Sequence, residues 1–154
     1  MKNKIELGYL VLDVLTGIVG VADHRVAYLN AATRYCIQPR VSPDGTLRES
    51  IFADEHQVEY VEPLEQIVNS ANEPPVRIGV GQECYDSIKK SGGICTARAV
   101  YLNGCARVLI EPRFRFGFKR DGWWEYELNV TPIGEFVPMP AVKTGGPGRL
   151  SSRR

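Results

Sequence analysis

The sequence predicts a mainly all-β protein made of two tandem small modules joined by one short helix. Three observations predict this fold. The chain repeats itself at a fixed spacing, apolar and polar residues alternate in each copy as they do in short strands, and a proline-bounded polar segment separates the copies. With 154 residues, of which 44% are hydrophobic, the chain can bury a core, and its length allows one domain or two small ones.

The repeat emerges when the chain is shifted against itself by 73 residues. The residues that then coincide are Gly8/Gly81, Asp13/Asp86, Gly20/Gly93, Arg25/Arg98, Tyr28-Leu29-Asn30/Tyr101-Leu102-Asn103, Arg34/Arg107, Ile37/Ile110, Pro39/Pro112 and Arg40/Arg113. So many matches at one spacing indicate an internal duplication. Asp44-Gly45 recurs as Asp121-Gly122 at a spacing of 77, and this difference of 77 − 73 = 4 predicts a four-residue loop insertion in the second copy.

Each copy has the elements of a small SH3-like barrel. In the first copy, residues 9–13 predict a strand, Thr16-Gly17 breaks it, and residues 18–29 predict a long strand bent at Gly20. A hairpin follows, and Pro39 ends its second strand because proline cannot donate a ladder hydrogen bond. The prediction is therefore two tandem SH3-like barrel modules.

The second copy contains the clearer hairpin. Residues 96–102 and 105–111 flank Asn103-Gly104, the dipeptide favoured in a two-residue type I′ turn. That turn would place Arg98 and Arg107 beside each other on the face opposite the apolar side chains. The same register in the first copy would bring its two arginines together.

The segment between the copies predicts the joining helix. Residues 63–75 suit one short helix, which Pro74-Pro75 would end. We expect a first β module over residues 1–62, helix and linker over 63–76, a second β module over 77–137 and a tail over 138–154. The tail is rich in Pro and Gly and poor in apolar residues, which predicts disorder.

Two resemblances extend this interpretation. Residues 13–22 resemble the start of KOW and related SH3-like modules. More of the chain resembles a class of small uncharacterised phage and prophage proteins with a D-x-x-T-G-x-x-G-x-A start, a Y-L-x-G-C turn and a D-E-x-Q-[LV]-E end, matched here by residues 13–22, 101–105 and 54–59. The chain departs from that pattern at Asn30-Ala31-Ala32, which lacks the Gly-Cys pair, and at Ser91-Gly92-Gly93, which replaces the start in the second copy.

Charge and apolar patterning narrow the function classes. Nineteen basic and 18 acidic residues give a net charge of +1, so no whole-protein field attracts nucleic acid or an anionic membrane. No apolar run approaches the roughly 18 residues of a membrane span, and the N-terminus lacks a signal-peptide core. We therefore expect a cytoplasmic protein of a bacterial host cell, with no membrane partner.

The repeated arginines are the candidate ligand-binding residues, because guanidinium groups bind phosphate and carboxylate with paired hydrogen bonds. We expect phosphates to contact the four arginines, a base to stack on an aromatic ring, and an asparagine to contact a ribose. The candidate residues are Arg25, Arg34, Arg98, Arg107, Tyr101, Trp124 and Asn103. Two other interpretations stay open: each arginine pairs with a nearby acid, or the arginines form a partner-protein surface.

A basic and aromatic stretch over residues 113–120 is a second candidate. Its alternation predicts a strand with one basic and one aromatic face, which could stack a base and bind phosphates. Alternatively, its aromatic residues bury against Trp123, Trp124 or another subunit.

Catalytic and metal patterns are missing from the sequence. His24 and His56 have no nucleophile at a motif spacing, the four cysteines form no C-x-x-C pair, and Cys105 has no neighbour that would lower its pKa. We expect no enzyme activity, no cofactor and no bound metal. The favoured function is a phage-type anti-defence protein that sequesters a nucleotide-derived immune signal, similar in kind to the Thoeris and CBASS signal sponges, as a homo-oligomer. The alternatives are a phage structural or assembly protein and a KOW-like nucleic-acid-binding module, the latter possible but not favoured.

Overall fold

The computed structural model describes residues 4–113 and 121–134. These residues form one antiparallel sheet of ten strands and two 3₁₀ helices, with no α-helix among them. The prediction of a mainly β protein is therefore confirmed. No helix in the described ranges is long and apolar enough to cross a membrane. Most of the basic and aromatic stretch, over residues 114–120, and the tail over 138–154 lie outside these ranges.

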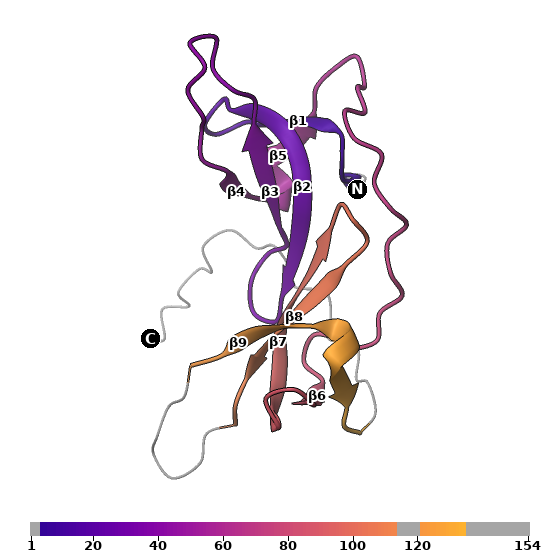
Figure 1. The fold of residues 1–154 in the computed structure, drawn as a ribbon. Coiled ribbons are helices and arrows are strands. Elements are labelled where there is room, and N and C mark those ends of the chain that lie inside the picture. The colour runs from indigo at the N-terminus through magenta and orange to yellow at the C-terminus, as the bar shows by residue number, and fades with distance from the viewer. Residues whose placement is uncertain (1–3, 114–120, 135–154) are drawn as a thin grey trace, which may run out of the picture.

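The two halves contain the same elements in the same order (Figure 1). The first half comprises β1 (Leu10–Asp13), β2 (Val19–Tyr28), β3 (Arg34–Pro39), β4 (Ile51–Asp54), η1 (Glu55–Gln57) and β5 (Val58–Tyr60). The second half comprises β6 (Glu83–Asp86), β7 (Ser91–Tyr101), β8 (Ala106–Glu111), β9 (Trp123–Tyr126), η2 (Glu127–Asn129) and β10 (Val130–Pro132). Within each half the strands pair in the order β5-β1-β2-β3-β4 or β10-β6-β7-β8-β9.

The repeat extends to details of the strands. A β-bulge interrupts the β2–β3 pairing between Ala22 and His24, and one interrupts the β7–β8 pairing between Cys95 and Ala97, 73 residues later. The strands β4 and β9 begin at Ile51 and Trp123, an offset of 123 − 51 = 72. The predicted four-residue insertion is therefore wrong, because the Asp-Gly pairs that suggested it occupy different places in their loops.

The two halves meet where β2 pairs with β7 (Figure 1). Val26 lies opposite Ala99, its own counterpart in the repeat, and an approximate two-fold axis therefore passes between them. Two backbone hydrogen bonds across this junction are related by the same axis: Leu29 N donates to Thr96 O, and Leu102 N donates to Asp23 O. The duplicated halves thus associate as a symmetric pair within one chain.

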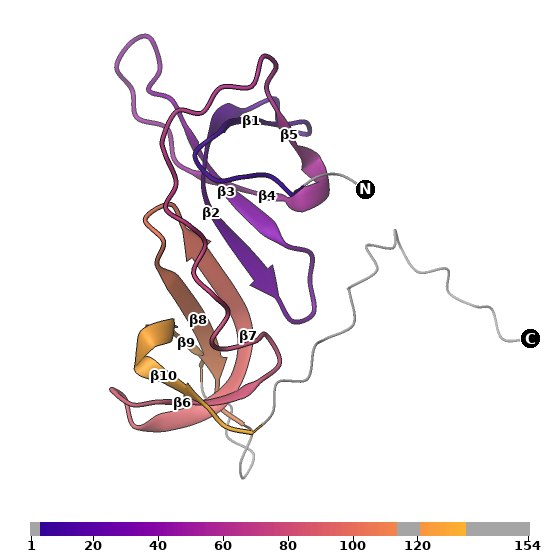
Figure 2. The same ribbon diagram turned by 90° about the vertical axis from the view of Figure 1, so that its right-hand side faces the viewer.

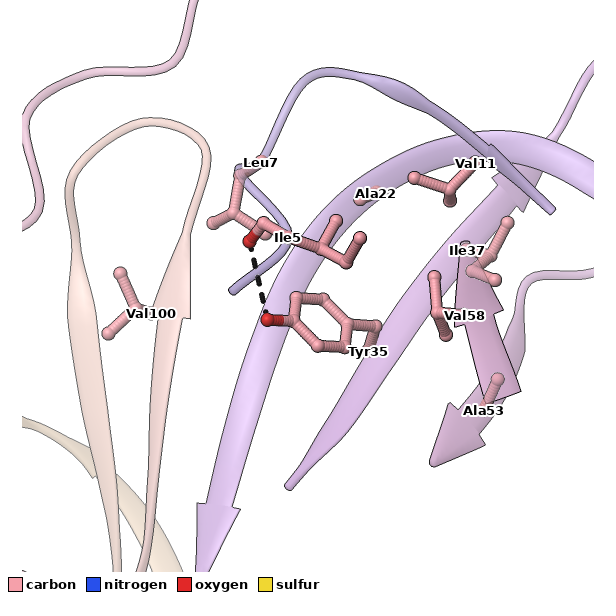
Figure 3. Close-up of a cluster of buried hydrophobic side chains, with 9 residues drawn as sticks. All are labelled: Ile5, Leu7, Val11, Ala22, Tyr35, Ile37, Ala53, Val58 and Val100. Carbon is pink, nitrogen blue, oxygen red and sulfur yellow. Dashed lines mark hydrogen bonds between the residues drawn. The ribbon is translucent and has the colours of Figure 1, made fainter. Parts of the chain in front are cut away.

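Each half has its own buried core. Figure 3 shows the first core, where the Tyr35 hydroxyl donates a hydrogen bond of 3.3 Å to Ile5 O and Val100 enters from β7 of the other half. The residues of this core are Ile5, Leu7, Val11, Ala22, Tyr35, Ile37, Ala53, Val58 and Val100. The second core contains their counterparts Ile78, Cys84, Cys95, Val108, Ile110 and Val130.

The segment between the halves is extended, so the predicted joining helix is wrong. It runs from β5 along the β7–β8 hairpin (Figure 2). Its backbone donors pair with neighbouring elements instead of forming helical bonds: Ile67 N donates to Gly8 O and Ala71 N donates to Leu102 O. Tertiary pairing therefore overrides the local helix preference, which is weak in so short a segment.

Candidate functional site

The β7–β8 hairpin turns through three residues, where the sequence predicted two. Tyr101 N donates to Cys105 O, and Gly104, with φ of 79°, is the one turn residue in the left-handed region. Asn103 accepts a hydrogen bond from Cys105 N through Oδ1. A type I′ turn needs positive φ at both central positions, and Asn103 does not supply it.

This turn shifts the strand register by one residue. Arg98 lies opposite Val108 and Arg107 lies opposite Ala99, so the two arginines point to opposite faces of the sheet. The same holds in the first half. Arg25 lies opposite Tyr35, which is the neighbour of Arg34 on β3, so these two arginines also point to opposite faces. The expectation that each half places its two arginines side by side is therefore wrong.

Arg25 and Arg98 share the face that packs on the cores, and both pair with acids. Arg98 is buried and donates to Glu127 through Nε at 2.9 Å and through a terminal nitrogen at 3.0 Å. Arg25 donates to Glu73 Oε1 at 2.6 Å, and Lys4 pairs with the same carboxylate. These two arginines act as structural partners of carboxylates.

Arg34 and Arg107 share the opposite face, called here the outer face. Arg34 is about half exposed and donates to Asp54 through Nε at 2.8 Å, which raises the pKa of its guanidinium. Arg107 lies over the Tyr126 ring at 5.2 Å from the ring centroid, and its Nε is buried with no hydrogen-bond partner. No ion pair engages Arg107 within the described residues.

Aromatic side chains flank these arginines on the outer face. Tyr28 and Tyr101 are counterparts in the repeat, and both pack against the small residues at the junction of the halves. Trp124 lies opposite Leu109 and packs against the same cluster. We call this set the junction surface, although three of its members, Val26, Ala97 and Ala99, form a small buried cluster at its centre. The other members, which are at least partly exposed, are Tyr28, Arg34, Tyr101, Arg107, Leu109 and Trp124.

The structure thus separates the residues predicted from sequence. Arg34, Arg107, Tyr101 and Trp124 lie on the junction surface, whereas Arg25 and Arg98 lie on the other face and Asn103 stays in its turn. Tyr28 was missed as a site residue, although the repeat aligns it with Tyr101.

One open cavity of about 470 Å³ lies elsewhere, between loops of the first half. Its lining residues are Thr16, Gly17, Ile18, Val19, Arg40, Val41, Ser42, Pro43 and Arg48. Arg48 donates to Ser42 Oγ at 2.8 Å, and Arg40 pairs with Glu65 at 3.7 Å. None of the predicted ligand-binding residues lines this cavity.

No protein-family model, curated protein or solved structure matches this chain. The resemblance to phage proteins remains an expectation.

The cysteines differ sharply in predicted reactivity. Burial raises the pKa of Cys84 to about 11 and that of Cys95 to about 12, and it also raises the pKa of Cys36, whereas Cys105 is exposed. Because the thiolate is the reactive form, iodoacetamide at neutral pH should alkylate Cys105 alone in the native protein and all four thiols in denaturant. Mass spectrometry of the labelled peptides tests this, and native modification of Cys84 or Cys95 would contradict it.

Proposed function

We propose that this protein is a non-catalytic, phage-type anti-defence protein that sequesters a phosphate-bearing nucleotide signal of host immunity on the junction surface. Arg107 carries the proposal. Its guanidinium is partly buried, stacks on an aromatic ring and leaves Nε without a partner. A buried donor without an acceptor costs free energy, which a ligand oxygen would recover.

The layout of the junction surface supports a ligand with two anionic groups. Arg34 and Arg107 are counterparts on either side of the axis through Val26 and Ala99. Three strand spacings of about 4.8 Å separate their backbones by roughly 14 Å. Arg34 now pairs with Asp54 on β4 and Arg107 lies over Tyr126 on β9, so both side chains would turn toward the axis to hold one small molecule. A cyclic dinucleotide, with two phosphates and two bases related by two-fold symmetry, matches this pseudo-symmetric arrangement.

The aromatic residues complete the proposed site. Tyr28 and Tyr101 stand at counterpart positions, and Trp124 lies in the same strand row as Tyr28. Stacking on such rings contributes about 1–3 kcal/mol per base.

We also propose that each half is an SH3-like barrel. Its five-strand order and the 3₁₀ helix before its last strand support this proposal.

Thermal unfolding with and without candidate ligands tests the proposal. The probes are cyclic di-AMP, cyclic di-GMP, cyclic GMP-AMP and cyclic ADP-ribose. A ligand at a hundredfold excess over its Kd stabilises a protein by about 2.7 kcal/mol, and we expect one probe to raise Tm by several degrees. The same probe should be recovered chemically unchanged.

Matched arginine variants locate the site. Arg107→Gln and Arg34→Gln should each abolish most of the stabilisation, whereas Arg113→Gln, which removes an exposed ion pair with Glu83, should retain it. Loss of binding in Arg40→Gln, with binding kept in Arg107→Gln, would place the ligand in the loop cavity and contradict the junction surface. A salt-sensitive shift with RNA or DNA, with no effect of the small probes, would favour a nucleic-acid-binding module.

The edges of the sheet favour a second candidate, a phage structural or assembly protein. Among the described strands, β4 pairs only with β3 and β9 only with β8. Phe52 on β4 and Tyr126 on β9 are 49% and 53% exposed. Open edges with exposed aromatic residues can pair with other chains. Light scattering that shows concentration-dependent oligomers, together with no response to the small probes, would support this role over the first.

A further inference from the structure

Three potential metal ligands meet at the bulge of β2. One candidate ligand atom from each of Asp23, His24 and Cys36 lies within 4.8 Å of the other two. Asp23 Oδ2 and His24 Nδ1 are 2.9 Å apart. Asp23 is the residue that the bulge inserts, and His24 lies opposite Cys36 on β3. The bulge therefore brings two consecutive residues to the thiol of the neighbouring strand.

The surroundings hold these ligands in place. The His24 ring stacks on Tyr101 at a centroid distance of 4.5 Å and meets the edge of Phe52 at 5.5 Å. The Cys36 side chain is buried, whereas the Asp23 carboxylate is 44% exposed. An ion could thus enter from the Asp23 side, and the imidazole and thiol would not need to be ordered on binding.

The second half supplies an internal comparison. It keeps the bulge and the strand register, but the counterparts of the three ligands are Thr96, Ala97 and Leu109. None of these three side chains is a usual metal ligand. The bulge itself therefore does not require an acid, an imidazole and a thiol, and all three occur together in one half only.

We propose that Asp23, His24 and Cys36 bind one Zn²⁺ ion. A thiolate, an imidazole and a carboxylate form a set that zinc favours, and three protein ligands leave a fourth tetrahedral position for water or another ligand. Bond lengths of about 2.0–2.3 Å put neighbouring ligand atoms roughly 3.3–3.8 Å apart, so shifts of about 1 Å complete the site. Binding forms the zinc–sulfur bond and releases the thiol proton to solvent.

The spacing of the three proposed zinc ligands along the sequence does not identify them as a metal site. Asp23 and His24 are adjacent on one strand, Cys36 lies on the next, and no C-x-x-C or H-x-x-x-H motif marks them. The expectation of no bound metal depended on such motifs, on the presence of only two histidines and on the spacing of the acidic residues. This proposal does not rest on the ligand proposed for the junction surface, although the two sites adjoin where His24 stacks on Tyr101.

Cobalt substitution tests the site directly. Titration of the full-length protein with Co²⁺ should give one equivalent of tetrahedral cobalt, with a thiolate-to-cobalt charge-transfer band and visible d–d bands that Zn²⁺ displaces. Cys36→Ser should lose the charge-transfer band, whereas Cys105→Ser, which removes the exposed thiol, should keep it. His24→Ala and Asp23→Asn should each weaken Co²⁺ binding by at least about tenfold, because even the loss of an outer-shell partner costs about 10–100-fold in metal affinity.

Two outcomes overturn the proposal. One is a wild-type protein without a charge-transfer band; the other is a band that persists in Cys36→Ser and disappears in Cys105→Ser. If Cys36→Ser does not fold, the partly exposed Asp23→Asn variant decides, because unchanged Co²⁺ affinity there excludes this ligand set. Added Zn²⁺ should also raise the Tm of the wild type, and raise that of His24→Ala less at the same concentration.

Discussion

Replacing Glu127 by alanine is expected to lower the free energy of unfolding by about 3–5 kcal/mol, the usual effect of removing one partner of a buried ion pair. Arg98 would be left as a buried, uncompensated cation. Glu127 Oε1 also accepts hydrogen bonds from Arg77 N and Ile78 N, which would lose their partner. Chemical denaturation followed by tryptophan fluorescence measures the change.

Two controls separate burial from charge. In the double variant Arg98→Met/Glu127→Leu, much of the lost stability should return, because apolar residues of similar size often replace a buried ion pair without loss. Arg34→Ala, which removes an ion pair to Asp54 from a side chain 48% exposed, should cost less than about 1 kcal/mol. A Glu127→Ala cost as small as that of Arg34→Ala would contradict the buried-pair assignment.

Glu127 also gives this stability a pH dependence. Burial alone would raise its pKa, but hydrogen bonds from Arg98 and from the backbone N–H groups of Ile78 and Arg77 outweigh it and lower the pKa below 4.5. A carboxyl whose folded-state pKa is depressed stabilises the protein above its unfolded-state pKa. The contribution of Glu127 should therefore be complete at neutral pH and decline as the pH falls below about 4.5.

The mainly β architecture and its two-fold repeat were predictable, because each copy of the duplicated sequence can be compared with the other. The spacing of 73 identifies counterpart residues without a structure, and it aligns the bulges, the turn glycines Gly8 and Gly81, and most of the two cores. The joining segment was not predictable in this way, because its backbone bonds go to Gly8 and Leu102, which are distant in sequence. The composition of residues 63–75 does not indicate those partners.

The site was less predictable, because face assignment in a hairpin depends on the turn. Asn103-Gly104 is compatible with a two-residue or a three-residue turn, and the choice between them moves Arg98 from one face of the sheet to the other. The repeat correctly made Arg25 and Arg98 equivalent, yet equivalence could not show that Glu73 and Glu127 pair with them. Only the packing of distant segments supplies those acids.

The other large effect is expected at Gly20 and Gly93. Gly20→Ala would place a Cβ atom 2.4 Å from Gln38 O, and Gly93→Ala would place one 2.2 Å from Glu111 O. Both obstacles are backbone atoms of the paired strand, which cannot move without breaking the β2–β3 or β7–β8 ladder. Each substitution should therefore cost about 3 kcal/mol or more, at or above the usual range for overpacking. Urea denaturation of the two variants measures the cost.

Gly92→Ala is the matched control, since it lies beside Gly93 on β7 and its added Cβ would sit 3.1 Å from Cys84 O. That contact is tight but less severe, so the cost of Gly92→Ala should be clearly smaller than that of Gly93→Ala.

The comparison between the two halves is the sharper test. Gly20 and Gly93 bend counterpart strands against counterpart carbonyls, so Gly20→Ala and Gly93→Ala should be destabilising to a similar degree. A large cost in one half and none in the other would mean that the two bends are not equivalent.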